Sequence, residues 1–372
     1  MYLKDLVDIQ MGQSPESKFY NYDKIGLPFY QGKADFGKIN PTPKMWCSKS
    51  KKEAKPNDIL ISVRAPVGDL NINNEQSCIG RGLAAITCKS DVDMMYLYYH
   101  LKYLKPQLRH ISTGSTFESI NRSQLENLII KYKSYTEQIK ISNTLQVVQR
   151  QIDVKESLLG LYDLLIKSRF VDMFGDPVLN EKGWNLTSLE SVCQSIYGGG
   201  TPSKKIKEYY MGTIPWVTSK DMKSDIIVDS IEHITQVAID NSSTKIIPPE
   251  SVLIVIRSGI LKHTLPVCIN KSKVTINQDL KALVLDERCK GIYLQYLLKA
   301  LEKDILSGVR AVTADNIEFN SLKKRKIPIP PINIQIKFSQ MVNQINKLKS
   351  DVQKSIDETQ LLMDSLMQEY FG

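Results

Sequence analysis

The chain carries an internal duplication, and this repeat restricts its fold more than any other feature of the sequence. The segment Gln138-Ile139-Lys140 recurs as Gln335-Ile336-Lys337, and positions 138 and 335 differ by 197. The same offset relates Phe174-Gly175 to Phe371-Gly372. One register therefore holds over the last eighty or so residues of each half.

Nearer the start of each half the two copies match less closely, and the offset changes. Pro28 pairs with Pro215 at an offset of 187, and Arg64 pairs with Arg257 at an offset of 193. A changing offset requires insertions, which surface loops tolerate. Each half therefore combines a variable front with a back of constant register.

The back of each half has an apolar pattern with steps of three and four residues, which predicts a long helix. We expect helices over 138–171 and 335–370, each roughly 34 residues and about 50 Å long. A helix of this length cannot bury its apolar seam alone, so we expect the two to pair antiparallel as a coiled coil. The predicted seam contains Ile141, Leu145, Val148, Ile152, Leu159, Tyr162, Ile166, Phe338, Val342, Ile345, Val352, Ile356, Met363 and Leu366. Three polar residues, Lys155, Lys349 and Thr359, interrupt it.

The front of each half alternates short β-rich runs with turn-rich stretches, which is typical of a mixed α/β domain. The sequence thus predicts an α+β protein with a pseudo-twofold internal repeat. Two mixed α/β domains are expected at 1–134 and 176–328, with coiled-coil helices at 135–175 and 329–372.

Composition narrows the classes of function. The 372 residues carry 49 Lys and Arg against 40 Asp and Glu, a net charge of +9, which favours a polyanionic partner. No apolar run approaches the ~20 residues that cross a bilayer, and the first residues do not resemble a secretory signal. The six cysteines are far apart in the sequence, as expected of reduced thiols, so we expect a cytoplasmic protein.

Signatures of catalysis are missing from the sequence. There is no phosphate-binding loop of the G-x-x-x-x-G-K-[ST] type, and Gly198-Gly199-Gly200 fits a turn better than a dinucleotide site. The Pro-Pro pairs at 248–249 and 330–331 lack the Asn/Asp-Pro-Pro-aromatic pattern of enzymes that methylate DNA amines. We therefore expect no catalytic residue and no metal site.

These features together resemble the specificity (S) subunit of type I restriction–modification systems. Each half opens with Leu-x-x-Leu and a polar segment, in Leu3 to Pro15 and in Leu186 to Pro202. The most specific part is Ile327-Pro328-Ile329-Pro330-Pro331 leading into Gln335. The family pattern has Glu before this Gln; the first half keeps it as Glu137-Gln138, whereas the second half has Ile334.

The resemblance implies a non-catalytic DNA reader. Each α/β unit would be a target recognition domain that reads one half of a bipartite, asymmetric sequence in double-stranded DNA. The helices would set the spacing and dock two modification (methyltransferase) subunits, with restriction subunits as further partners. S-adenosylmethionine, and ATP with Mg²⁺, would be bound by those partners and not by this chain.

DNA contacts are expected from basic and small polar side chains on loops, because Lys and Arg meet phosphates and Arg, Lys, Ser and Thr also meet base edges. Repeat pairing motivates Lys33 with Lys220 and Arg64 with Arg257. The full set is Lys33, Arg64, Arg81, Thr113, Gly114, Ser115, Thr116, Lys204, Lys205, Lys220, Arg257, Lys262 and Arg310. For Arg64 and Arg257, a structural ion pair is an equally good interpretation.

Two other functions compete with the DNA reader. One is a coiled-coil scaffold that gathers proteins without touching DNA. The other is a DNA methyltransferase or nuclease whose motif is not recognised. Salt-sensitive DNA binding would argue against the scaffold, and methyl transfer by the purified chain alone would favour the enzyme.

Overall fold

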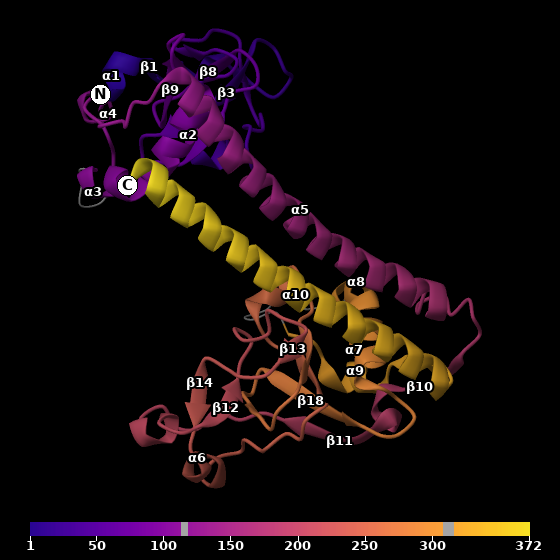
Figure 1. The fold of residues 1–372 in the computed structure, drawn as a ribbon. Helices are drawn as coiled ribbons and strands as arrows, with labels where there is room; N and C mark the ends of the chain where they lie inside the picture. The colour runs from indigo at the N-terminus through magenta and orange to yellow at the C-terminus, as the bar shows by residue number, and fades with distance from the viewer. Residues whose placement is uncertain (113–117, 308–315) are drawn as a thin grey trace. The chain divides into compact units, whose positions relative to one another are not determined.

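The structure is a computed structural model that describes residues 1–112, 118–307 and 316–372. Five residues expected to contact DNA lie outside these ranges: Thr113, Gly114, Ser115, Thr116 and Arg310. Contacts divide the chain into two compact units (Figure 1). Unit 1 comprises Met1–Ser157 with Gln353–Gly372, and unit 2 comprises Leu158–Val352. No helix in the described ranges is both long and apolar enough to cross a lipid bilayer.

Unit 1 is built on two sheets. An antiparallel sheet has the strand order β1-β9-β6-β7, and a second sheet has the order β2-β4-β3-β8-β5, in which β3 and β8 are parallel. The strands are β1 Val7–Met11, β2 Tyr20–Asn21, β3 Leu27–Tyr30, β4 Trp46–Cys47, β5 Glu53–Ala54, β6 Ile59–Ser62, β7 Leu70–Ile72, β8 Ser77–Ile79 and β9 Leu83–Cys88. The short helices are α1 Leu3–Leu6, η1 Ser17–Phe19, η2 Lys33–Asp35, α2 Met94–Tyr103, α3 Lys105–Ile111 and α4 Arg122–Glu126.

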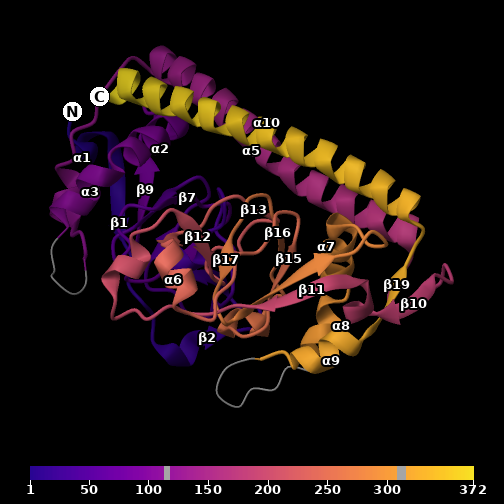
Figure 2. The same cartoon turned by 90° about the horizontal axis from the view of Figure 1, so that it is seen from below.

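Unit 2 is also built on sheets, with the strand orders β11-β18-β15-β16-β13, β14-β12-β17 and β10-β19. The strands are β10 Asn185–Ser188, β11 Cys193–Gly198, β12 Ile214–Val217, β13 Ile226–Ile227, β14 Glu232–Ile234, β15 Val252–Val255, β16 Val267–Asn270, β17 Thr275–Ile276, β18 Leu280–Leu285 and β19 Lys326–Ile329. The helices are η3 Leu189–Val192, η4 Lys207–Tyr210, α6 Gln236–Asp240, η5 Gly259–Lys262, α7 Gly291–Ala300, α8 Glu302–Ser307 and α9 Phe319–Lys324. Helix α7 packs on β15 and β16 (Figure 2).

The two units share one topology, which confirms the duplication. The order β1-β9-β6-β7 of unit 1 reappears as β11-β18-β15-β16, and the parallel pair β3·β8 reappears as β12·β17. Part of the drift in offset has a visible cause. A β-bulge between Cys193 and Ser195 adds one residue to β11, so Val7 corresponds to Cys193 but Asp8 corresponds to Ser195.

The first leucines of the two Leu-x-x-Leu openings, Leu3 and Leu186, do not occupy equivalent positions. The backbone N–H of Leu3 donates to Leu128 O, and the equivalent hydrogen bond in unit 2 comes from Leu189, which donates to Arg325 O. Leu3 and Leu189 are fully buried, whereas Leu186 is 53% exposed on β10. The buried leucine that anchors the core therefore defines the equivalence of Leu3 with Leu189. The Leu-x-x-Leu pattern that begins at Leu186 starts three residues before that position.

Two 40-residue helices complete the fold, α5 Tyr135–Phe174 and α10 Ile332–Phe371 (Figure 1). They pack antiparallel. In unit 1 the start of α5 packs against the end of α10, and in unit 2 the end of α5 packs against the start of α10. Each helix begins three residues earlier than expected, and α5 ends three residues later and α10 one residue later. Ser134 and Glu137 form the expected capping box at the start of α5.

Every predicted seam residue is buried or half-buried in the structure. The best buried part lies toward the helix ends, where Leu145 and Phe338 are fully buried. Aromatic residues that the sequence pattern did not predict close the seam. Phe371 packs edge-on against Tyr96 in unit 1, and Phe174 packs edge-on against Tyr293 in unit 2.

A buried glutamine holds the start of each long helix. Gln138 accepts from the Asp93 N–H at 2.9 Å and donates to the carbonyl oxygens of Asp91 and Lys133. Gln335 makes the same three hydrogen bonds to the residues at the 197-residue offset, Lys290, Arg288 and Pro330. The glutamine thus carries this geometry, and both halves keep it although only the first has Glu before it.

Candidate nucleic-acid interface

Three loops of unit 1 meet at one edge of its sheets and carry three of the predicted DNA contacts. Gly80 N–H donates to Tyr30 O at 2.8 Å, and Val63 N–H donates to Gly82 O at 2.9 Å. These bonds bring together the loops that hold Lys33, Arg64 and Arg81. We call residues 31–33, 64–69 and 80–82 loop cluster 1. Close approach of the backbones explains Gly82, where a Cβ would lie 2.3 Å from Gln31 O.

Unit 2 repeats this arrangement with equivalent hydrogen bonds. Asn277 N–H donates to Val217 O at 3.0 Å, and Ile256 N–H donates to Asp279 O at 2.8 Å. We call residues 218–221, 257–262 and 277–279 loop cluster 2. It holds Lys220, Arg257 and Lys262. The structure therefore brings the repeat-paired basic residues to the same place within each unit.

Lys33 and Lys220 occupy equivalent positions after β3 and β12 but have different neighbours. Lys33 Nζ lies 2.9 Å from Asp69 Oδ2, whereas no ion pair of the Lys220 ammonium is seen within the described ranges. Lys220 is exposed on a turn that Asp221 holds by accepting from Thr218 N–H at 2.8 Å. Such a turn presents the ammonium group to solvent and to any phosphate that approaches.

Arg64 and Arg257 also occupy equivalent positions. Arg64 forms a β-bridge with Ser119 and Arg257 forms one with Asn316, and these two partners are related by the 197-residue offset. Of the two interpretations, the structural ion pair applies to Arg257, and Arg64 stays a candidate for DNA contact. Arg257 Nε donates to Asp279 Oδ1 at 2.7 Å, with the arginine side chain 47% exposed. Arg64 is exposed and makes no ion pair to another described residue.

Arg81 has a counterpart that sequence analysis missed. The 197-residue offset places Gln278 at this position, where it is exposed and contacts Thr201 Oγ1 through its side-chain oxygen. An amide reads adenine well and an arginine reads guanine well. Applying the offset to Arg81 would have found this residue.

Of the remaining predicted residues, Lys204 and Lys205 lie outside the two loop clusters. Lys204 Nζ lies over the rings of Trp216 and Tyr210, 5.7 and 5.9 Å from their centres, and Lys205 is exposed beside it. Lys262 ends η5 within loop cluster 2.

Asp69 links two loops of loop cluster 1 to helix α3. It takes ion pairs from Lys33 and from Lys105 at the first residue of α3. Burial alone would raise the pKa of Asp69, but the hydrogen bonds from Lys105 and Lys33 prevail and lower it below its usual value. The carboxylate therefore stays ionised and restricts Lys33 to one side of the cluster.

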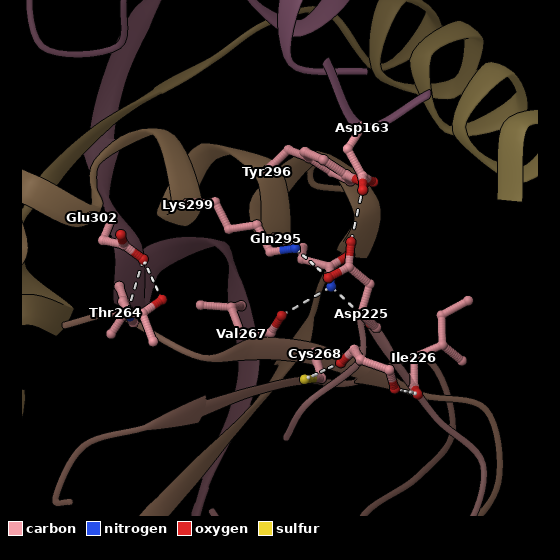
Figure 3. A network of polar contacts seen from close by, with 12 residues as sticks. Asp163, Asp225, Ile226, Thr264, Val267, Cys268, Gln295, Tyr296, Lys299 and Glu302 are labelled. Atoms are coloured by element: carbon pink, nitrogen blue, oxygen red, sulfur yellow. Dashed lines mark hydrogen bonds and ion pairs between the residues drawn. The ribbon is translucent and has the colours of Figure 1, made fainter. Parts of the chain in front are cut away.

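Helices α7 and α8 anchor loop cluster 2 through a polar network (Figure 3). Asp225, just after the Lys220 turn, receives the ammonium group of Lys299 and the hydroxyl of Tyr296 at 3.2 Å. Glu302 accepts from Thr264 Oγ1 at 3.0 Å and from Leu265 N–H at 2.8 Å, just after η5. The segments that follow the Lys220 turn and η5 are thus both bonded to helices α7 and α8.

Outward-facing apolar side chains form a second surface on the long helices. In unit 1, Val147 and Val154 of α5 are 51% and 67% exposed and lie seven residues apart. They line a shallow hollow of 350 Å³ with Arg150, Gln151 and Lys155. In unit 2, Leu161 and Leu164 of the same helix are similarly exposed. Exposed apolar stripes of this kind are typical of protein contact surfaces.

Comparison with known proteins matches both halves to one family. The family model "Type I restriction modification DNA specificity domain" matches residues 1–159 and 181–359. The chain is 44% identical over 148 residues to the putative type I restriction enzyme MjaX specificity subunit of Methanocaldococcus jannaschii, covering 40% of this chain and 35% of that protein. It is 26% identical to the MjaIX specificity subunit of the same organism, covering 98% of this chain and 90% of that protein.

Two further relatives complete the comparison. The EcoR124I/EcoR124II specificity subunit of Escherichia coli is 36% identical over 43% of this chain and 40% of its own length. The chain thus matches only about two fifths or less of the MjaX and EcoR124I proteins. A crystal structure of the S subunit from M. genitalium superposes with a TM-score of 0.60 at 16% identity, over 100% of this chain and 95% of that one, which confirms the fold.

Proposed function

Because the chain belongs to the type I restriction–modification DNA specificity family, we propose that it is the DNA-reading subunit of a type I restriction–modification complex. Unit 1 reads one half of a bipartite site and unit 2 reads the other. The observation that carries this proposal is the repeated loop cluster, which presents Arg64 and Arg81 in unit 1 and Lys220 and Gln278 in unit 2.

The chemistry of the clusters suits DNA on two levels. Exposed Lys and Arg side chains meet phosphates in any sequence, and the bidentate side chains of Arg81 and Gln278 reach base edges. Equivalent loops with different side chains explain how one scaffold reads two different half-sites. A target without internal symmetry follows from this difference.

The long helices supply the second part of the proposed function, which is to dock methyltransferase subunits on the exposed apolar face of α5. The methyl donor S-adenosylmethionine, and ATP with Mg²⁺ for restriction, belong to those partners. Val154→Lys places a charge in the lining of the hollow in unit 1 and should reduce co-purification with the methyltransferase subunit at least tenfold. Val154→Leu keeps the apolar surface and should retain the partner.

Mapping of N6-methyladenine in the host genome, with and without this gene, tests the reading function directly. We expect one bipartite motif with a constant gap to lose methylation when the gene is deleted, and to regain it on complementation. An unchanged methylome in cells that express the chain and its methyltransferase would overturn the proposal. Methyl transfer by the purified chain alone would overturn the non-catalytic role.

A further inference from the structure

Each of the three polar residues that interrupt the seam, Lys155, Thr359 and Lys349, contacts a polar side chain of the other helix. In unit 1, Lys155 Nζ of α5 donates to Thr359 Oγ1 of α10 at 2.6 Å and to Ser355 O at 3.1 Å. Thr359 is 7% exposed, so this contact lies inside the seam. In unit 2, Lys349 Nζ of α10 lies 2.5 Å from Asp163 Oδ1 of α5.

The repeat offset shows what α5 would face if it paired with the α5 of a second copy. The residue of α5 that corresponds to Thr359 is Tyr162, since their numbers differ by 197, and the residue that corresponds to Lys349 is Ile152. An α5–α5 pair in the same register would therefore set Lys155 against Tyr162 and Asp163 against Ile152. The ammonium then faces a phenol in place of the threonine hydroxyl, and the carboxylate loses its cation.

Pairing of α10 with the α10 of a second copy is unfavourable for the same reason. Val352 corresponds to Lys155, and Gln360 corresponds to Asp163. An α10–α10 pair would set Thr359 against Val352 and leave Lys349 against a neutral amide. Both contacts seen in the structure are thus present only when α5 pairs with α10.

The terminal phenylalanines of the two helices do not make this distinction. Phe174 and Phe371 are equivalent, and each packs on an equivalent tyrosine, Tyr293 in unit 2 and Tyr96 in unit 1. The centre of the seam, in contrast, differs between the two helices in charge and in hydrogen bonding. Single polar residues at seam positions are known to set partner choice in coiled coils.

We propose that Lys155–Thr359 and Lys349–Asp163 form a pairing code that makes α5 select α10 over the α5 of a second copy. A second copy offers α5 an equivalent helix, its own α5, and pairing of like helices would give a dimer of the chain. The code penalises like pairing because it separates Lys155 from Thr359 and Lys349 from Asp163. This role is independent of DNA and of any methyltransferase.

The test uses the full chain with the two polar contacts removed by substitutions in α5, which we call the erased code. Lys155→Val together with Asp163→Gln places the residues of α10 at the equivalent positions of α5, so that an α5–α5 pair no longer strands a charge. Two copies with different affinity tags are co-expressed, and purification on one tag measures how much of the other copy is retained. We expect at least a fivefold rise in co-purified copy over the unmutated pair, and a dimer peak by light scattering.

A matched control keeps the ion pair between Lys349 and Asp163 but exchanges the two charges between the helices. Lys349→Asp with Asp163→Lys preserves the ion pair between α5 and α10 and still mismatches like helices, so it should remain at the unmutated level. Helical circular dichroism of all variants shows that the helices form. No rise for the erased code, or an equal rise for the exchanged pair, would overturn the proposal. Lys155→Met alone, a milder change, should give an intermediate rise.

Discussion

The Nε2 atom of His100 accepts a hydrogen bond from the backbone N–H of Lys131 at 3.1 Å inside unit 1. An accepting Nε2 carries no proton, so the neutral ring holds its proton on Nδ1. The side chain is 1% exposed and lies 4.6 Å from the ring of Phe371 at the end of α10. Burial lowers the pKa of His100 to about 4.

We predict that acid weakens unit 1 through this histidine. The unfolded chain protonates His100 below its ordinary pKa of 6.5, while the folded chain resists protonation until about 4. The unfolded state therefore binds more protons between these values, and stability falls as the pH is lowered through that window. At pH 5 the loss amounts to about 2 kcal/mol relative to pH 7.

Urea unfolding at pH 7 and pH 5 measures this loss. His100→Leu introduces the residue found at the equivalent position of unit 2, Leu297, and should remove this part of the pH dependence. An unchanged difference between the two pH values in the variant would show that another group is responsible.

The glutamine clamp predicts a large and symmetric effect on stability. Gln138→Ala removes three hydrogen bonds and leaves the N–H of Asp93 and two carbonyl oxygens unsatisfied, which costs about 3 kcal/mol at roughly 1 kcal/mol per bond. Gln335→Ala should cost a similar amount. Glu137→Ala, which removes only an exposed cap, is the control and should cost about 1 kcal/mol. Denaturant midpoints that rank Glu137 with the glutamines would contradict the clamp.

Arg64→Ala should weaken recognition of one half-site and leave the other unaffected, because loop cluster 1 belongs to unit 1 alone. Arg257→Ala should affect the opposite half-site and should also leave Asp279 without its cation. Loss of one good bidentate base contact costs about 1–3 kcal/mol. Binding or methylation of DNA altered in each half separately gives the readout, and equal losses on both halves would count against separate readers.

Helix length should set the gap between the half-sites. A heptad added to both α5 and α10 keeps the seam in phase and lengthens each helix by about 10 Å, or roughly three base pairs. Methylome mapping of cells with this variant should show the same half-sites with a longer gap. A heptad added to α5 alone offsets Lys155 from Thr359 and should impair folding. An unchanged gap in the doubly extended protein would refute the spacing role.

Several features could be predicted because they repeat in the sequence. Lys33 with Lys220 and Arg64 with Arg257 lie at equivalent loops, since the strands before them pair in the same way in both units. Gln278 was missed because its partner Arg81 differs in type, and a comparison of residue types cannot detect an equivalence that only position preserves. The partner of Arg257 also escaped, because Asp279 is 22 residues away and reaches it through the sheet.

The sequence by itself determined the duplication, the two mixed α/β units, the long helices and the apolar side of each helix, because periodicity and repetition are properties of the chain. Tertiary structure alone decided which polar residues face one another. Lys155 and Thr359 looked like two defects in a seam until antiparallel pairing placed them in contact. The physical reason is that a hydrogen bond depends on distance in space, which packing sets and which separation along the chain does not record.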